Sequence, residues 1–333
     1  MNATLAFPRS GDLRAARSPS TVPVRSADEL RRALRAARER ALTLDVSGLN
    51  RMLRLDGQRR QIELQAATSW SAVAAYLVEH GVASAAAGLA GNLAGSVGEA
   101  VSENGPGPDG TPMSLHVEAI TLVTAEGDVR RADRHANSDL FALAIGGHDL
   151  IGVLYSVTLR IDSLSRAVNR AEPPIVLDLG QSVPPGGVAR KAEFLVPPEQ
   201  LDAVLASFKD VASERRIHLE SVTVRRLQPE HETFLRWATR EWAEVTLRYS
   251  VRPTLSACVH ATEIERLLLD TVVASGGSFR IGAAQHPSME QLERCYPKLG
   301  AFIAEKKRYD PAERLQNAWY RRLAAQLRHE GRD

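Results

Sequence analysis

Residues 95–107 read GSVGEAVSENGPG, and residues 146–153 read GGHDLIGV. Glycine has no side chain, so the main-chain amides of such stretches can approach a neighbouring group closely. Successive amides can form a concave nest that suits a diphosphate. The second stretch does not match the dinucleotide fingerprint, which has a strand before its glycines and a helix after them. The first stretch therefore indicates either a phosphate site of another type or a loop in tight packing.

Helices and strands alternate around these two stretches. Ser26-Ala-Asp-Glu29 is a capping box, which predicts a helix to about Arg40. Thr68 can cap a second helix that ends at Gly81 in a left-handed conformation. The alternation of apolar and polar residues and the turn residues predict the remaining elements: strands at 41–46 and 61–66, a hairpin at 119–129, a short helix from 138 and a strand at 153–161.

The second half of the chain has a different order of elements. Prolines and glycines at 172–187 break regular structure. The elements expected beyond them are a strand at 190–196, a helix at 198–215, strands at 217–225 and 243–251, a helix at 262–275 and a strand at 278–283. That βαββαβ order is typical of a ferredoxin-like domain. Asp310-Pro311 introduces a final helix, and Lys306-Lys307-Arg308 reads as a solvated helix end.

Length and pattern together predict two domains, since about 150 residues is usual for one domain. We expect a flexible tail at 1–21, a first domain at 22–165, a linker at 166–188, a ferredoxin-like domain at 189–300 and a C-terminal helical segment at 301–333. The chain has 333 residues, so both domains can bury a core.

Composition excludes several classes of function. The chain has 42 Lys and Arg against 40 Asp and Glu, and this balance speaks against nucleic acid as a partner. No apolar run is long enough to span a membrane, and no His, Cys, Asp or Glu residues show metal-ligand spacing. Cys258 and Cys295 fit no disulfide framework, so we expect a reducing compartment, the cytoplasm.

The order of the motifs resembles the FAD-binding domain of vanillyl-alcohol-oxidase-type flavoproteins, the PCMH-type superfamily. The resemblance rests on the two glycine-rich stretches, on LVTAEGD at 122–128, on NSDLF at 137–141 and on the closing pattern around 309–323. Within the superfamily, the chain is most similar to the aldonolactone and sugar-alcohol oxidases and the decaprenylphosphoryl-ribose oxidase group.

The resemblance implies an α+β fold, in which a two-lobed FAD-binding domain is followed by a ferredoxin-like substrate domain and C-terminal helices that return to the FAD domain. It implies a small-molecule substrate. It also assigns cofactor contacts to Gly95, Ser96, Val97, Gly98, Asn104, Gly105, Gly107, Gly152, Val153 and Asn317. Pro106 stands where many relatives carry the histidine that attaches the flavin, so the resemblance implies non-covalent FAD.

Other positions depart from the family. The relatives carry a diphosphate loop before the strand that ends in Leu44-Asp45, but here Arg40 runs directly into Ala41 and the loop is missing. Several charge-assisted hydrogen bonds to the diphosphate are lost with it. Asp149 replaces a usual glycine, which places a negative charge near an anionic ligand.

The substrate side departs as well. Ala283 stands where the relatives have a lysine near the flavin, and alanine cannot take or place a proton. His286, three residues further on, is the candidate catalytic residue.

Two functions stay open on the sequence. The first is a FAD-dependent oxidoreductase that oxidises a sugar, polyol or aldonolactone-type alcohol by hydride transfer to the flavin. The alternative is a non-catalytic pseudo-oxidase that has lost FAD and acts as a scaffold or partner of another protein. The glycine-rich stretches and Asn317 favour the first, whereas the missing loop and Ala283 favour the second.

Overall fold

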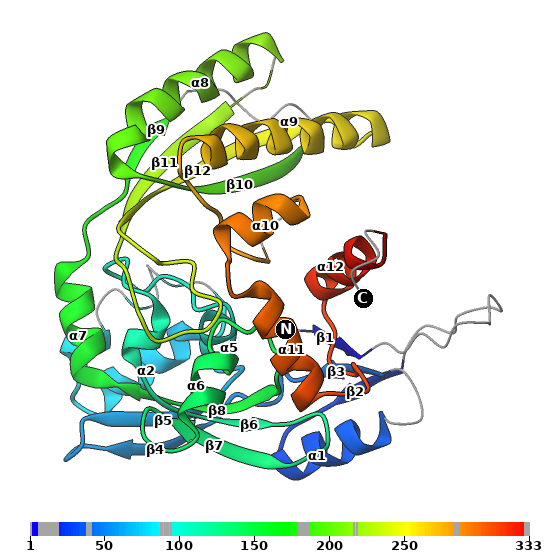
Figure 1. The fold of residues 1–333 in the computed structure, drawn as a ribbon. Coiled ribbons are helices and arrows are strands. Elements are labelled where there is room, and N and C mark those ends of the chain that lie inside the picture. Colours follow the sequence, from blue (N-terminus) through cyan, green and yellow to red (C-terminus); the bar gives the residue numbers. More distant parts are fainter. Residues whose placement is uncertain are drawn as a thin grey trace. The chain divides into compact units, whose positions relative to one another are not determined.

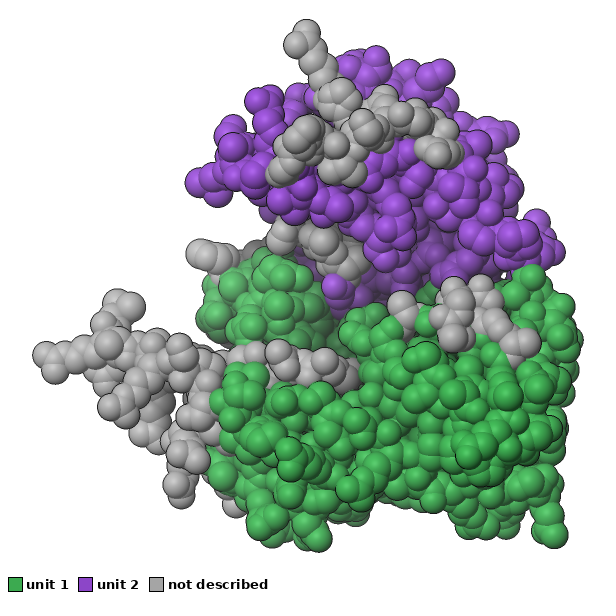
Figure 2. Space-filling model, turned by 180° about the vertical axis from the view of Figure 1, so that it is seen from behind, with its two compact units in different colours: residues 1–171, 232–235, 298–333 green, residues 172–231, 236–297 purple. Residues whose placement is uncertain are grey.

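The computed structural model describes residues 2–5, 20–37, 42–86, 89, 93, 95–178, 187–215, 217, 219–282 and 287–329. The chain forms two compact units, coloured separately in Figure 2. Unit 1 consists of residues 1–171, 232–235 and 298–333, and unit 2 consists of residues 172–231 and 236–297. The chain therefore passes into unit 2, returns to unit 1 for one short segment, and ends in unit 1.

The first lobe of unit 1 is a three-stranded sheet with one helix. Strand β3 (Leu42–Asp45) pairs antiparallel with β1 (Asn2–Leu5) and parallel with β2 (Ser20–Pro23). Helix α1 (Ala27–Ala36) begins at Ser26, whose hydroxyl accepts the amide of Glu29 at 3.2 Å, as the sequence predicts. Leu30 and Leu34 of α1 are buried with Leu44 in the core of this lobe. Strand β1 lies in the stretch for which the sequence predicts a tail.

The second lobe of unit 1 is a five-stranded antiparallel sheet. Its order is β4 (Met52–Asp56), β5 (Gln61–Gln65), β8 (Val153–Arg160), β6 (Val117–Val123) and β7 (Val129–Asp133). Its helices are α2 (Trp70–Glu79), α3 (Ala83–Ala86), α5 (Val97–Ser102), α6 (Ser138–Ala144) and α7 (Ile161–Arg170), with the 3-10 turn η1 (Met113–His116). Helices α2, α5 and α6 lie on one side of the sheet (Figure 1).

Most local predictions in the two lobes of unit 1 are confirmed, and two differ from the structure. Strands β6 and β7 form the expected hairpin around Gly127, and Gly81 ends α2 with a φ of 76°. The cap of α2 is Ser69 rather than Thr68, because the Ser69 hydroxyl accepts the amide of Ala72. Helix α7 occupies residues that the sequence assigns to the end of the first domain and the start of a linker.

Unit 2 has the predicted ferredoxin-like arrangement. Its antiparallel sheet has the order β10 (Val188–Val196), β12 (Trp242–Val251), β11 (Leu219–Leu227) and β9 (Ile175–Asp178). The expected last strand is reduced to one bridge between Ser278 and Leu195 of β10, and β9 adds a strand at the opposite edge. The other elements are η2 (Pro198–Gln200), α8 (Leu201–Glu214), α9 (Leu255–Ala274) and α10 (Met289–Cys295). Helices α8 and α9 pack together over one face of the sheet (Figure 1).

The C-terminal helices α11 (Leu299–Tyr309) and α12 (Ala318–His329) belong to unit 1. The interpretation of 306–308 as a solvated helix end is wrong for Lys306, which is completely buried and donates to Asp310 at 2.5 Å. A buried lysine needs such a carboxylate partner, because an unpaired charge away from water is very unfavourable. Lys307 and Arg308 are exposed, as predicted. Among the described residues, no helix is both long and apolar enough to cross a membrane.

Candidate functional site

The first glycine-rich stretch and its continuation, residues 95–112, form what we call the connector. It contains a helix, α5, which begins at Ser96. The Ser96 hydroxyl accepts the amide of Glu99 at 3.2 Å, and the Glu99 carboxylate accepts the amide of Ser96 at 3.3 Å. This reciprocal pair is a capping box, and it satisfies two amides at the helix start within the chain itself.

The next two amides of α5 also have partners in the protein. The amide of Val97 donates to the Thr68 carbonyl at 2.9 Å, and that of Gly98 donates to the Ala66 carbonyl at 2.6 Å. A Cβ atom on Gly98 would lie 2.6 Å from the Ala66 Cβ atom. Glycine is therefore required at 98 by the close approach of two backbone segments. Gly95, just before the cap, is exposed and has a φ of 73°.

Asn104 connects the second half of the connector to two other segments. It is fully buried, with a φ of 47°. Its side-chain oxygen accepts the amide of Ser114 at 2.8 Å, and its amide group donates to the Thr233 hydroxyl at 3.4 Å. Asparagine tolerates the left-handed conformation, so one residue both turns the chain and holds η1 in place.

Gly105 and Gly107 hold a tight loop after Asn104. The Gly105 amide donates to the Ala100 carbonyl at 2.7 Å, and the Gly107 amide donates to the Thr111 carbonyl at 2.6 Å. A Cβ atom on Gly107 would lie 2.7 Å from Nε2 of His116. Gly107 is thus explained by the imidazole that packs against it.

His116 is the centre of a buried hydrogen-bonded chain that the sequence did not indicate. Its Nδ1 lies 2.8 Å from the Ser163 hydroxyl and its Nε2 lies 2.8 Å from the Thr111 hydroxyl. The Thr111 hydroxyl donates to Asp109 at 2.5 Å, so Nε2 of His116 carries the ring proton. The Ser163 hydroxyl lies between Nδ1 of His116 and the Leu115 carbonyl, which it reaches at 3.2 Å. Burial lowers the pKa of His116 to about 4, and the ring is therefore neutral at pH 7.

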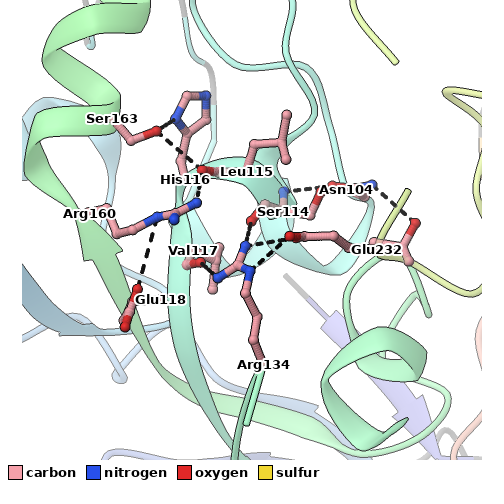
Figure 3. Close-up of polar contacts among 11 residues, drawn as sticks. Asn104, Ser114, Leu115, His116, Val117, Glu118, Arg134, Arg160, Ser163 and Glu232 are labelled. Carbon is pink, nitrogen blue, oxygen red and sulfur yellow. Dashed lines mark hydrogen bonds and ion pairs between the residues drawn. The ribbon is translucent and has the colours of Figure 1, made fainter. Parts of the chain in front are cut away.

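Two arginines lie beneath η1 (Figure 3). Arg134 donates to the Ser114 and Val117 carbonyls at 2.9 and 2.7 Å and to both oxygens of the Glu232 carboxylate at 2.7 and 2.8 Å. Arg160 donates to the Leu115 carbonyl. Glu232 belongs to the segment 232–235. This segment lies between β11 and β12 in the sequence but is part of unit 1. A partner 98 positions away along the chain leaves no local signal in the sequence.

The second glycine-rich stretch docks on the C-terminal end of α5. The amide of Gly146 donates to the Val101 carbonyl at 3.1 Å, and that of His148 donates to the Ser102 carbonyl at 2.9 Å. Asn317 donates to the His148 carbonyl at 2.9 Å, and its side-chain oxygen accepts the amide of Tyr320 at the start of α12. The structure therefore brings the connector, the loop at 146–149 and Asn317 together.

The last two residues of that stretch are packed inside unit 1, and Val153 belongs to the same core cluster as Leu30 and Leu34 of α1. A Cβ atom on Gly152 would lie 2.6 Å from a methyl group of Leu122, and Val153 is buried opposite Val123 on β6. Both residues are accounted for by packing of the sheet.

Asp149 makes the docked end of α5 acidic. It follows His148, and both residues have positive φ angles. The pKa of Asp149 is raised to about 6, chiefly by burial and in smaller part by the carboxylates of Glu103 and Glu99, against hydrogen bonds from Ser102 and Leu154 that lower it. At pH 7 Asp149 is still mostly ionised, so it adds negative charge beside α5.

These contacts test whether α5 fits the diphosphate of FAD. A diphosphate is held by unoccupied amides or by cations. The amides of residues 96–99 all have partners within the chain, and Glu99, Glu103 and Asp149 are anionic. The described start of α5 therefore does not fit this group. Residues 38–41, where the departure from the family's loop falls, and residues 283–286, with Ala283 and His286, lie outside the described residues.

The described fold is α+β: a two-lobed unit combined with a ferredoxin-like unit. In a comparison with known families, residues 30–133 match the family model described as "FAD binding domain". Together with the fold, this match supports the PCMH-type FAD-binding superfamily, the class that the sequence resemblance implied.

Solved structures extend the likeness of fold to most of the chain. Two variants of berberine bridge enzyme, one with a cysteine and one with a histidine replaced by alanine, each match with a TM-score of 0.60. Their sequence identities are 10% and 11%; each match covers 90% of this chain, and 90% and 89% of the other chain. At such identity the likeness shows the fold alone. Comparison with the curated proteins found no match.

Proposed function

We propose that the chain is a FAD-dependent oxidoreductase that oxidises a CH–OH group of a sugar, polyol or aldonolactone-type compound. The observation that carries the proposal is the grouping of the connector, the loop at 146–149 and Asn317 within a domain of the FAD-binding type. FAD, when bound, supplies the hydride acceptor. Gly95, Gly105 and the loop at 146–149 are the parts of this group that we propose for cofactor contact.

The proposed polyhydroxyl substrate is supported by the sheet of unit 2. Side chains alternate between the two faces of a strand, so Glu244 of β12 lies on the face opposite α9. Glu244 accepts from Arg280 at 2.7 Å and from Arg225 at 2.8 Å, and Arg280 also reaches Glu193 at 3.0 Å. Burial would raise the pKa of Glu244, but the two arginines hold it below its ordinary value. We propose that a ligand rich in hydroxyl groups binds by exchanging hydrogen bonds with these charged groups, which are paired with one another in the structure.

Flavin content of the purified full-length protein tests the proposal. A yellow protein that releases FAD on denaturation, and whose flavin is bleached by a sugar, polyol or aldonolactone without oxygen, is the expected result. Added FAD should also raise the melting temperature, because a ligand that binds only the folded state stabilises it. A colourless protein that added FAD does not stabilise would refute the oxidoreductase.

His286 stays the proposed catalytic residue, and its test needs the flavin-loaded protein. Replacing it by alanine should slow flavin reduction by substrate, and an unchanged rate would remove it from the mechanism.

The alternative function, a pseudo-oxidase that serves as a scaffold or partner, is favoured by one observation. The amides at the start of α5 are bonded within the chain, as they would be in a fold that no longer binds a diphosphate there. This alternative predicts a colourless protein with an unchanged melting temperature in the presence of FAD.

A further inference from the structure

Glu99 lies at the start of α5, where the resemblance assigns cofactor contacts to Ser96, Val97 and Gly98. Its carboxylate accepts the amide of Ser96, which a bound anion would otherwise use, and it carries a full negative charge next to that position. A Cβ atom on Gly95 would lie 2.4 Å from the same carboxylate, so the side chain folds back over the residue before the cap. The carboxylate therefore covers this end of the helix.

We propose that Glu99 is an internal substitute for the anion, and that it lowers the affinity of this fold for any cofactor that carries a diphosphate. The proposal rests on the proposed function, because it concerns the same FAD site. Its chemical content is specific: Glu99 opposes the phosphates of the cofactor and leaves the flavin ring unaffected.

A capping box accepts either glutamate or glutamine at this position, so the charge of Glu99 can be removed while the cap is kept. Helix α10 has the same capping box in unit 2, where the Ser288 amide donates to the side-chain oxygen of Gln291 at 2.8 Å and the Ser288 hydroxyl accepts the Gln291 amide at 3.2 Å. A neutral glutamine makes the same two hydrogen bonds. The negative charge of Glu99 is thus additional to what the cap requires.

The surrounding charges act in the same direction. Glu103 at the end of α5 and Asp149 in the docked loop are both acidic, and the charges of Glu99 and Glu103 act on the Asp149 carboxyl. Like charges at such short range repel by more than they would in water, because the partly buried site is less well screened. Glu99 brings the same negative charge to the start of the helix, where it would repel a dianionic ligand.

Binding titrations with three probes test the proposal on the full chain. FAD and ADP both carry a diphosphate, and riboflavin carries the flavin ring without phosphate. The variants are Glu99→Gln, which keeps the cap and removes the charge, and Glu99→Ala, which removes both. Glu103→Gln is the control for loss of one nearby charge, and Gln291→Ala is the control for loss of an equivalent cap. Circular dichroism and a melting curve confirm that each variant is folded.

We expect Glu99→Gln to bind FAD and ADP about tenfold more tightly than the unmodified chain, and Glu99→Ala more tightly again, with riboflavin unchanged. Glu103→Gln should have a smaller effect, and Gln291→Ala none. Equal affinity of the Glu99 variants and the unmodified chain for FAD would overturn the proposal for Glu99. If that shared affinity is high, the proposed oxidoreductase function is still supported. An equal gain for riboflavin would also overturn it. If no variant binds FAD at all, both the proposal and the oxidoreductase fail.

Discussion

The two ends of the connector are closed by opposite kinds of groups. At residues 96–99 a carboxylate accepts the amide of Ser96, and Asp149 adds negative charge at the other end of the same short helix. At residues 104–112 a neutral imidazole and a buried asparagine hold the loop, above two arginines that bind the carbonyls of η1. Both ends are rich in glycine, but in the structure these glycines allow close contact with other segments of the protein. Glycine density therefore marks close packing as readily as it marks a ligand.

This difference gives the two ends opposite responses to pH, and the larger effect belongs to His116. Its pKa in the folded chain, about 4, lies below the ordinary value of 6.5, so protonation favours unfolding. The stability that the neutral ring provides is complete above about pH 6.5 and is lost as the pH falls toward 4. We expect this group to remove about 2 kcal/mol from the free energy of unfolding between about pH 7 and pH 5.

Urea unfolding of the unmodified chain and of His116→Gln at both pH values measures this effect. Glutamine can hydrogen bond but does not titrate, so the variant should be less stable at pH 7 and should lose about 2 kcal/mol less on acidification. If the free energy of unfolding falls by the same amount in both proteins, His116 does not titrate as described. The two ends of the connector would then not differ in their response to pH.

Glycine substitutions sharpen the packing side of the comparison. Gly98→Ala would place a Cβ atom 2.6 Å from the Ala66 side chain and 2.7 Å from its carbonyl oxygen, so the backbone must shift. We expect a loss of about 1–3 kcal/mol in the free energy of unfolding, as for other overpacked sites. Gly105→Ala is the matched control, because its nearest contact would be an ordinary 3.6 Å from the Ala100 carbonyl. Its stability should change by about 0.5 kcal/mol or less.

Melting curves of the two alanine variants decide the point. Equal stability would show that the approach of α5 to Ala66 is not tight, and Gly98 would then be available to a ligand.

The fold was largely predictable because its signals are local. The hairpin of β6 and β7 follows from alternation around a turn, and the ferredoxin-like order of unit 2 follows from the sequence of periodic segments. The failures are also physical. Helix α9 begins at Leu255, seven residues before the predicted start, because Thr254 caps it while Leu255 is exposed and breaks the apolar pattern.

The site was less predictable, for two reasons. Ser96-Val-Gly-Glu99 is a capping-box pattern like that at Ser26, so the signal for α5 was present but was hidden by the surrounding glycines. His116 and Glu232 carried no such signal, because their partners Ser163 and Arg134 lie 47 and 98 positions away. Long-range polar pairs need the tertiary structure to be seen.

The smallest expected effect is the removal of the Asp149 charge, and it has the opposite sign to that of His116. The pKa of Asp149 in the folded chain, about 6, lies above the ordinary 3.8, so stability is highest when the group is protonated and is lost as the pH rises through 6. The shift alone corresponds to about 3 kcal/mol, and the partial exposure of Asp149 reduces it, so Asp149→Asn should stabilise the chain by about 1–2 kcal/mol near pH 8 and should have almost no effect near pH 4. Asparagine also tolerates the positive φ at 149 and can accept the Leu154 amide, so the variant changes little besides charge. Urea unfolding at both pH values measures the effect. An equal gain in the free energy of unfolding at pH 4 and pH 8 would mean that the Asp149 charge is not the cause. Water would then already screen the acidic groups at this end of the connector.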